Sequence, residues 1–82
     1  MKDVVALFYG DGGLKYFGEV ECGLEHGYGR SFKKGGILDF EGEFRKGKRH
    51  GIGREFQSGH SIFREGVWEE GEFVVNLELS VI

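Results

Sequence analysis

Glycines and aromatic residues recur every 24 residues through most of this chain. Gly18, Gly42 and Gly66 stand 24 apart, and setting residues 16–39 over residues 40–63 gives 9 identities in 24 positions. A fixed period between 20 and 50 residues indicates one supersecondary unit stacked on copies of itself. The chain is therefore predicted to be a repeat array, which more often offers a binding surface than a pocket for chemistry.

The composition favours strands over helices. The chain has 16 glycines and no proline, and each glycine inside a helix costs about 1 kcal/mol relative to alanine. Short aromatic runs separated by glycine turns indicate antiparallel strands instead. We therefore predict an all-β fold, a meander of antiparallel β-hairpins with seven or eight strands.

Length and charge narrow the class of protein further. Eighty-two residues predict one domain, and a net charge of −3 argues against a partner that is a nucleic acid polymer. Cys22 is the only cysteine, and no apolar run has the length of a signal sequence or a membrane span. We predict a cytoplasmic protein, with association at a membrane surface left open.

The period divides the domain at residues 1–82 into five parts. These are an N-terminal half-unit at 1–15, repeats at 16–39 and 40–63, a partial repeat at 64–72 and a capping strand at 73–82. The capping strand alternates Val75, Leu77, Leu79 and Val81 with polar residues. Because this apolar row lies on an edge strand, it is a candidate dimer contact.

Alternation along each strand places aromatic residues on one face and glutamates on the other. The glycines in phase with the aromatic residues leave room for neighbouring rings to lie over the backbone. The third unit departs from this pattern, since Arg64 stands where the earlier units have Tyr16 and Phe40. Either a β-bulge turns Phe63 inward, or Arg64 lines the apolar face.

Two segments carry a resemblance to a known family. They are Tyr16-x-Gly18-x-Val20-x-x-Gly23-x-x-His26-Gly27-x-Gly29 and Phe40-x-Gly42-x-Phe44-x-x-Gly47-x-x-His50-Gly51-x-Gly53. Over roughly residues 10–72 the chain resembles MORN repeats. It departs from their pattern at Val20 and Arg64, which replace aromatic residues, and in one extra residue per period.

The resemblance implies a curved single-layer sheet whose aromatic side chains line a groove. It also implies an interaction or scaffolding module, often a homodimer, with binding of anionic phospholipids in some members. Seven aromatic residues are predicted to line the groove and contact a partner: Tyr16, Tyr28, Phe32, Phe40, Phe44, Phe56 and Trp68.

No set of residues suits catalysis, a metal or a cofactor. His26 and His50 are one repeat apart, hence about 10 Å from each other, which is too far for one zinc ion. Each histidine is expected to pack or hydrogen-bond at its turn. We find no pairing of a nucleophile with a base and predict that the protein is not an enzyme.

Basic residues suggest a second kind of site. A cluster in the second hairpin turn and arginines in phase with groove aromatics are candidate contacts for an anion. The candidates are Arg30, Arg54, Arg64, Lys46, Lys48, Arg49 and His50. Each of these two sets also has a purely structural interpretation. The basic turn is then an ordinary solvated turn, and the arginines stack on aromatic rings.

We predict a non-enzymatic binding module that uses its aromatic groove to hold a protein or peptide, or a second copy of itself as a homodimer. Two alternatives stay open. One is binding of anionic phospholipid through the basic turn, and the other is sequestration of an anionic small molecule or nucleotide between the arginines and the aromatic rings.

Overall fold

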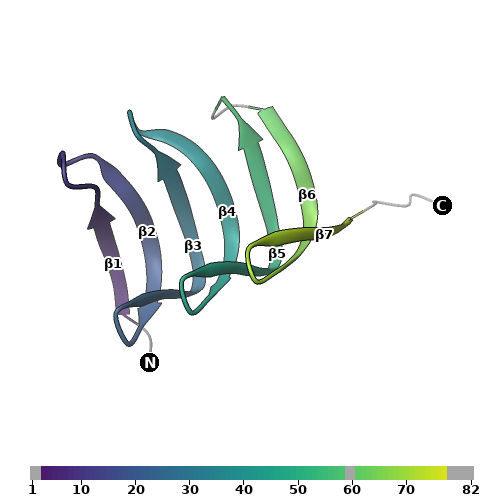
Figure 1. The fold of residues 1–82 in the computed structure, drawn as a ribbon, viewed down its shortest axis with the longest axis horizontal. Coiled ribbons are helices and arrows are strands. Elements are labelled where there is room, and N and C mark those ends of the chain that lie inside the picture. Colours follow the sequence, from purple (N-terminus) through teal and green to yellow (C-terminus); the bar gives the residue numbers. More distant parts are fainter. Residues whose placement is uncertain (1–2, 59–60, 78–82) are drawn as a thin grey trace.

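Seven strands form one open, curved sheet in the computed structural model, which describes residues 3–58 and 61–77 (Figure 1). The strands are β1 (Asp3–Phe8), β2 (Leu14–Glu21), β3 (Leu24–Lys33), β4 (Ile37–Arg45), β5 (Lys48–Gln57), β6 (Ser61–Glu69) and β7 (Glu72–Asn76). Each pairs antiparallel with the next, in sequence order. The predicted all-β meander of hairpins in a single curved layer is confirmed.

Three hairpin turns on one side of the sheet share a backbone geometry that the 24-residue period dictates. In each turn a non-glycine residue with φ near +50° precedes a glycine with φ between +78° and +89°. These pairs are Cys22–Gly23, Lys46–Gly47 and Glu70–Gly71. Positive φ at both central residues is the type I′ conformation, whose twist matches that of the flanking strands.

The second and third of these turns also hydrogen-bond to the unit before them. The Gly47 amide donates to the Glu25 carbonyl at 2.9 Å, and the Gly71 amide donates to the Arg49 carbonyl at 2.8 Å. At the opposite side of the sheet the Tyr9 hydroxyl donates to the Phe32 carbonyl at 2.6 Å, which ties the first half-unit to the first repeat. These bonds fix successive hairpins as neighbours.

A row of aromatic rings forms the core of the sheet. Tyr16, Phe40, Phe44 and Trp68 are buried. Their rings meet edge to face in the order Tyr16–Phe44–Phe40–Trp68, with centroids 5.1, 5.3 and 5.2 Å apart. Edge-to-face contact is the favoured geometry for aromatic pairs, so this row of rings stabilises the single-layer sheet.

Glycines make this row possible. The Tyr16 ring lies over Gly29 and the Phe40 ring over Gly53, so closely that a Cβ at either glycine would overlap the ring. The inference that bare backbone leaves room for rings is thus confirmed, although the glycines under the rings are those of the return strands. Gly18 and Gly42 instead let the backbones of paired strands approach each other.

The third unit differs from the first two. Its first ring position is Arg64, which lies on the same face as the rings, while the register shift between β5 and β6 falls between Glu55 and Phe56. Arg64 therefore lines the aromatic face. Phe63 is the residue that this register shift leaves unpaired, as in a β-bulge, but its side chain is exposed beside Arg64 and is not buried with the core. The predicted capping strand is present as β7, and the Leu77 amide continues its pairing with β6 through the Glu65 carbonyl. Leu79 and Val81 lie outside the described residues.

Candidate functional site

The two faces of the sheet differ in chemistry. The ring face carries the buried rings Tyr16, Phe40, Phe44 and Trp68. The ladder face carries a row of charged residues that are cross-strand partners: Arg30, Glu41, Arg54 and Glu65. Because directly paired residues on neighbouring strands share a face, the register assigns each side chain to one face.

The charged row of the ladder face is a chain of ion pairs. Arg30 Nε lies 2.7 Å from Glu41 Oε2, and Arg54 lies 3.9 Å from the other oxygen of Glu41. Arg54 also donates to Glu65, and this hydrogen bond is the main reason that the pKa of Arg54 is raised. The predicted anion contacts Arg30 and Arg54 are thus already matched with carboxylates on this face.

Large apolar side chains stand exposed beside the charged row. Phe17 is the cross-strand partner of Arg30, and Tyr28 that of Glu43, so both belong to the ladder face. Val4 and Ile52 join them through their pairing with Glu19 and Val67. Tyr28 has 54% of its surface exposed. A monomer gains nothing from such exposure, which makes this face a candidate for contact with another molecule.

Two shallow hollows lie among these side chains. The first, of about 450 Å³, has a mainly apolar lining over a floor of Gly18 and Gly29. Its walls are Val4, Phe17, Glu19, Tyr28 and Arg30. The second, of about 200 Å³, has a floor of Gly42 and Gly53. Its walls are Tyr28, Glu41, Ile52, Arg54 and Glu65. The two floors are equivalent positions of successive repeats, and Tyr28 is a wall of both hollows.

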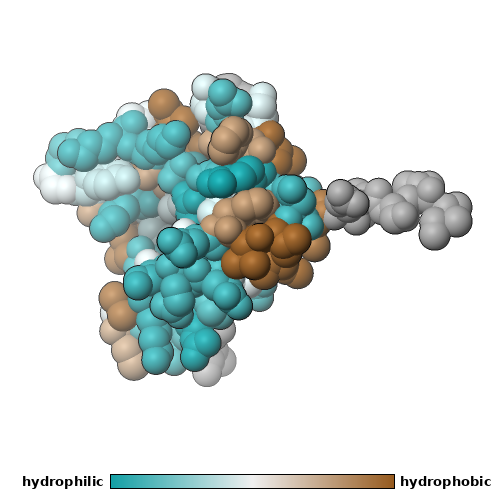
Figure 2. Space-filling view, turned by 45° about the vertical axis from the view of Figure 1, so that its right-hand side comes forward, coloured by the Kyte–Doolittle hydropathy of each residue, from teal (hydrophilic) through white to brown (hydrophobic). Residues whose placement is uncertain are grey.

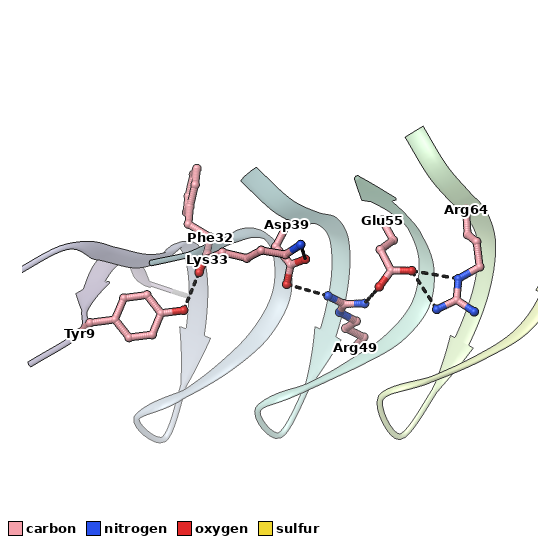
Figure 3. Close-up of polar contacts among 7 residues, drawn as sticks. All are labelled: Tyr9, Phe32, Lys33, Asp39, Arg49, Glu55 and Arg64. Carbon is pink, nitrogen blue, oxygen red and sulfur yellow. Dashed lines mark hydrogen bonds and ion pairs between the residues drawn. The ribbon is translucent and has the colours of Figure 1, made fainter. Parts of the chain in front are cut away.

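A network of ion pairs covers part of the ring face (Figure 3). Arg49 donates to Asp39 and Glu55, each at 3.0 Å, and its guanidinium lies 4.5 Å from the centre of the Phe40 ring and 4.9 Å from that of Trp68. Arg64 donates to Glu55 at 2.8 Å and lies over the Trp68 and Phe73 rings. Lys33 extends the network at 3.8 Å from Asp39.

The carboxyl of Glu55 is the central acceptor of this network. Burial alone would raise the pKa of Glu55, but hydrogen bonds from Arg49 and Arg64 and their positive charges lower it below its ordinary value. Glu55 therefore stays ionised between two arginines, Arg49 and Arg64, that both stack on rings. The predicted stacking holds for Arg64, whereas Arg30 and Arg54 pair with carboxylates. Arg49 belongs to the predicted basic turn.

The predicted basic turn is only partly available to an anion. Arg49 folds back over the rings, and the His50 Nδ1 accepts the Glu70 amide at 3.3 Å. Lys48 lies 3.9 Å from Glu70, whereas Arg45 and Lys46 are exposed. Anionic phospholipid binding through this turn stays a prediction.

The histidines act within the fold. His26 Nδ1 accepts the Lys46 amide at 3.3 Å, as His50 does for the amide one repeat later. Val74 stands where a third histidine would follow, so the last unit lacks this acceptor. The sequence predicts packing or a hydrogen bond at each histidine's own turn, whereas the hydrogen bond goes to the turn of the following unit. Within residues 3–58 and 61–77, no three potential metal ligands cluster.

The structure does not bring the predicted groove residues together as one open surface. Four of the seven aromatic residues are the buried core, with Tyr16 and Phe40 at 0% exposure. Tyr28 lies on the ladder face, while Phe32 and Phe56 are half-buried near the opposite turns. The predicted arginines of the groove are also divided between the faces. Arg64 lies on the ring face, whereas Arg30 and Arg54 lie on the ladder face.

Sequence reasoning missed Val4, Phe17, Ile52 and the glutamates that line the hollows. The pairing of Gly18 with Gly29 places Phe17 opposite Arg30, which puts the return-strand residues Tyr28 and Arg30 on the face away from the rings. The 24-residue period gives equivalent positions but not this register between the two strands of one hairpin. Pairing Gly18 with Gly29 across the hairpin is the sequence signal that would have given this register.

A second exposed apolar area lies at the C-terminal end of the sheet. Figure 2 shows hydrophobic side chains gathered beside the end of β7, among mostly hydrophilic residues. The exposed hydrophobic residues of this segment are Val74, Val75 and Leu77. They lie on or next to an open edge strand, where contact between two copies is favoured.

Comparison with known proteins agrees with the repeat. The family model described as MORN repeat matches residues 16–37 and 40–61, which together are more than half of the chain. No curated protein and no solved structure matched the chain significantly. In the described part of the chain, no helix has the length and apolarity needed to cross a membrane.

Proposed function

This chain belongs to the MORN-repeat family, and from that premise we propose that it holds a protein partner on its ladder face. MORN repeats are non-enzymatic repeat modules that generally serve as scaffolds binding proteins or membranes. The observation that carries the proposal is the position of the exposed rings Phe17 and Tyr28 around a hollow with a bare glycine floor.

The ladder face suits this role better than the ring face. The aromatic side chains of the ring face are already buried against one another, and Arg49 and Arg64 lie over them. Exposed aromatic side chains beside charged residues are the usual energetic centres of protein interfaces. Phe17 and Tyr28 meet that description.

The proposal is tested by affinity capture with matched variants. The wild-type chain, Tyr28→Ser and Phe63→Ser are immobilised, and the proteins that they retain from a host lysate are compared by mass spectrometry. Phe63 is the control because it is as exposed as Tyr28, at 58%, but contacts Arg64 on the other face. We expect Tyr28→Ser to lose a partner that Phe63→Ser keeps. Loss in Phe63→Ser alone would contradict the proposal.

Self-association through β7 is a second candidate. It is supported by Val74, Val75 and Leu77, which are exposed at an open edge. Light scattering would give a dimer for the wild type and a monomer for Val74→Lys, since a charge on an edge strand blocks pairing between edges. A wild-type chain that stays monomeric at high concentration would exclude this candidate.

A further inference from the structure

We propose that the ladder face recognises a polyproline II segment that carries an apolar side chain and, three residues later, a lysine or arginine. This rests on the proposed function, because it names the class of partner that the same face takes. Two observations carry it: the spacing of the two hollows, and the difference in charge between them.

The spacing comes from the repeat. The floors of the hollows, Gly18 with Gly29 and Gly42 with Gly53, occupy equivalent places in successive hairpins, hence two strands apart. Neighbouring strands lie about 4.8 Å apart, so the hollows are separated by roughly 9.6 Å along the array. Between them stands the ring of Tyr28, which is a wall of both.

Among peptide conformations, polyproline II fits this spacing. It turns once every three residues with a rise of about 3.1 Å, so every third side chain points the same way at intervals of about 9.3 Å. The two residues between point away from the surface and leave the Tyr28 ridge free.

A β-strand and an α-helix fit less well. A strand presents side chains to one face at intervals of about 6.7 Å, which no multiple brings to 9.6 Å. A helix has residues of one face every 5.4 Å. Two helical turns approach the spacing, but the turn between them would place a side chain against the Tyr28 ridge.

The chemistry of the hollows assigns the side chains. The first hollow is mainly apolar, and its one carboxylate, from Glu19, is matched in number by the one guanidinium of Arg30. It takes a leucine, valine or proline side chain against Phe17 and Val4.

The second hollow has two carboxylates, from Glu41 and Glu65, against the one guanidinium of Arg54. Glu41 is already held between Arg30 and Arg54, whereas among the described residues Glu65 is bound by Arg54 alone. Glu65 is therefore the carboxylate that favours a basic side chain in the second hollow.

The test uses fluorescence anisotropy with the full chain and three labelled proline-rich peptides. The first has leucine and arginine separated by two prolines. The second has the same composition with the two residues separated by one proline. The third has glutamate in place of arginine. We expect saturable binding of the first peptide, binding at least tenfold weaker for each of the others, and weaker binding of the first at higher salt.

Variants of the chain test whether the first peptide binds to the ladder face. Tyr28→Ala is expected to weaken binding of the first peptide at least tenfold, since Tyr28 lines both hollows. Phe63→Ala, the matched exposed aromatic on the other face, is expected to leave it within twofold. Glu65→Gln is expected to narrow the difference between the arginine and glutamate peptides. Circular dichroism checks that each variant keeps its sheet.

The outcomes separate this proposal from the function on which it rests. Equal binding of all three peptides, or no binding while the lysate partner is still lost in Tyr28→Ser, would overturn the polyproline II proposal and keep the binding face. Binding that Phe63→Ala abolishes and Tyr28→Ala preserves would overturn both.

Discussion

The two repeats that the family model matches, 16–37 and 40–61, share their strand register but differ in what covers their rings. In the first, the residue opposite Tyr16 is Ser31; in the second, the residue opposite Phe40 is Glu55. Arg49 reaches over Phe40 to bind that glutamate, whereas the first repeat has Glu25 at the equivalent place. The repeated residues thus build the frame, and the residues that differ decide the surface.

The largest effect should be equal in both repeats. Gly29→Ala and Gly53→Ala each place a methyl group inside the ring above, so each is expected to lower the free energy of unfolding by roughly 2–3 kcal/mol. Urea denaturation followed by Trp68 fluorescence measures this. Gly10→Ala is the control, because nothing lies within 4 Å of a Cβ there. A large effect in only one repeat would show that the two frames are not equivalent.

The next effect should separate the repeats. Arg49→Ala removes two ion pairs and a stacked guanidinium from a partly buried network and is expected to cost about 1.5–2 kcal/mol. Its counterpart Glu25→Ala is expected to cost less than about 0.5 kcal/mol. Arg49→Lys should recover little, because a lysine cannot bridge Asp39 and Glu55 with a planar fork.

Acid titration sharpens the same contrast. The pKa of Glu55 is lower in the folded chain than in the unfolded chain. Ionised Glu55 therefore adds fully to the free energy of unfolding when the pH is above the unfolded pKa, and this stabilisation is lost as the pH falls through the folded pKa. We expect this loss in the wild type and a smaller one in Arg49→Ala. An identical acid profile for the two chains would mean that the ion pairs contribute nothing.

Alkaline pH distinguishes the ring of the first repeat, Tyr16, which can ionise, from that of the second, Phe40, which cannot. Burial raises the pKa of Tyr16 to about 12, with smaller contributions from Glu25 and Glu19, and its hydroxyl donates to the Glu19 carbonyl at 2.6 Å. Between pH 10 and 12 the unfolded chain loses this proton first, so stability falls, by about 1.4 kcal/mol at pH 11. Tyr16→Phe, which gives the first repeat the ring of the second, should lack this part of the decrease.

The smallest effect concerns the junctions between units. His26→Ala and His50→Ala each leave a turn amide without its acceptor and are expected to cost about 1 kcal/mol. Hydrogen exchange should accelerate at the Lys46 amide in the first variant and at the Glu70 amide in the second. Unchanged exchange at both amides would mean that the histidines do not join the units.

The period was enough to predict the frame but not the site. Tyr16, Phe40 and the glycines recur at fixed intervals because each ring needs bare backbone beneath it, so strands, turns and stacking followed from the sequence. The covering of the ring face did not, because Arg49, Glu55 and Arg64 occur together in only one place. The exposed position of Phe17 and Tyr28 depended on the register within a hairpin, which a repeat length does not contain.

The most direct test of the account is to map a bound partner onto the sheet. Backbone amide shifts of the labelled chain are followed by NMR as the peptide with leucine and arginine three residues apart is added. The account predicts that the largest shifts fall at Phe17, Tyr28 and Ile52 on the ladder face. Shifts confined to Arg49, Glu55 and Arg64 on the ring face would contradict it.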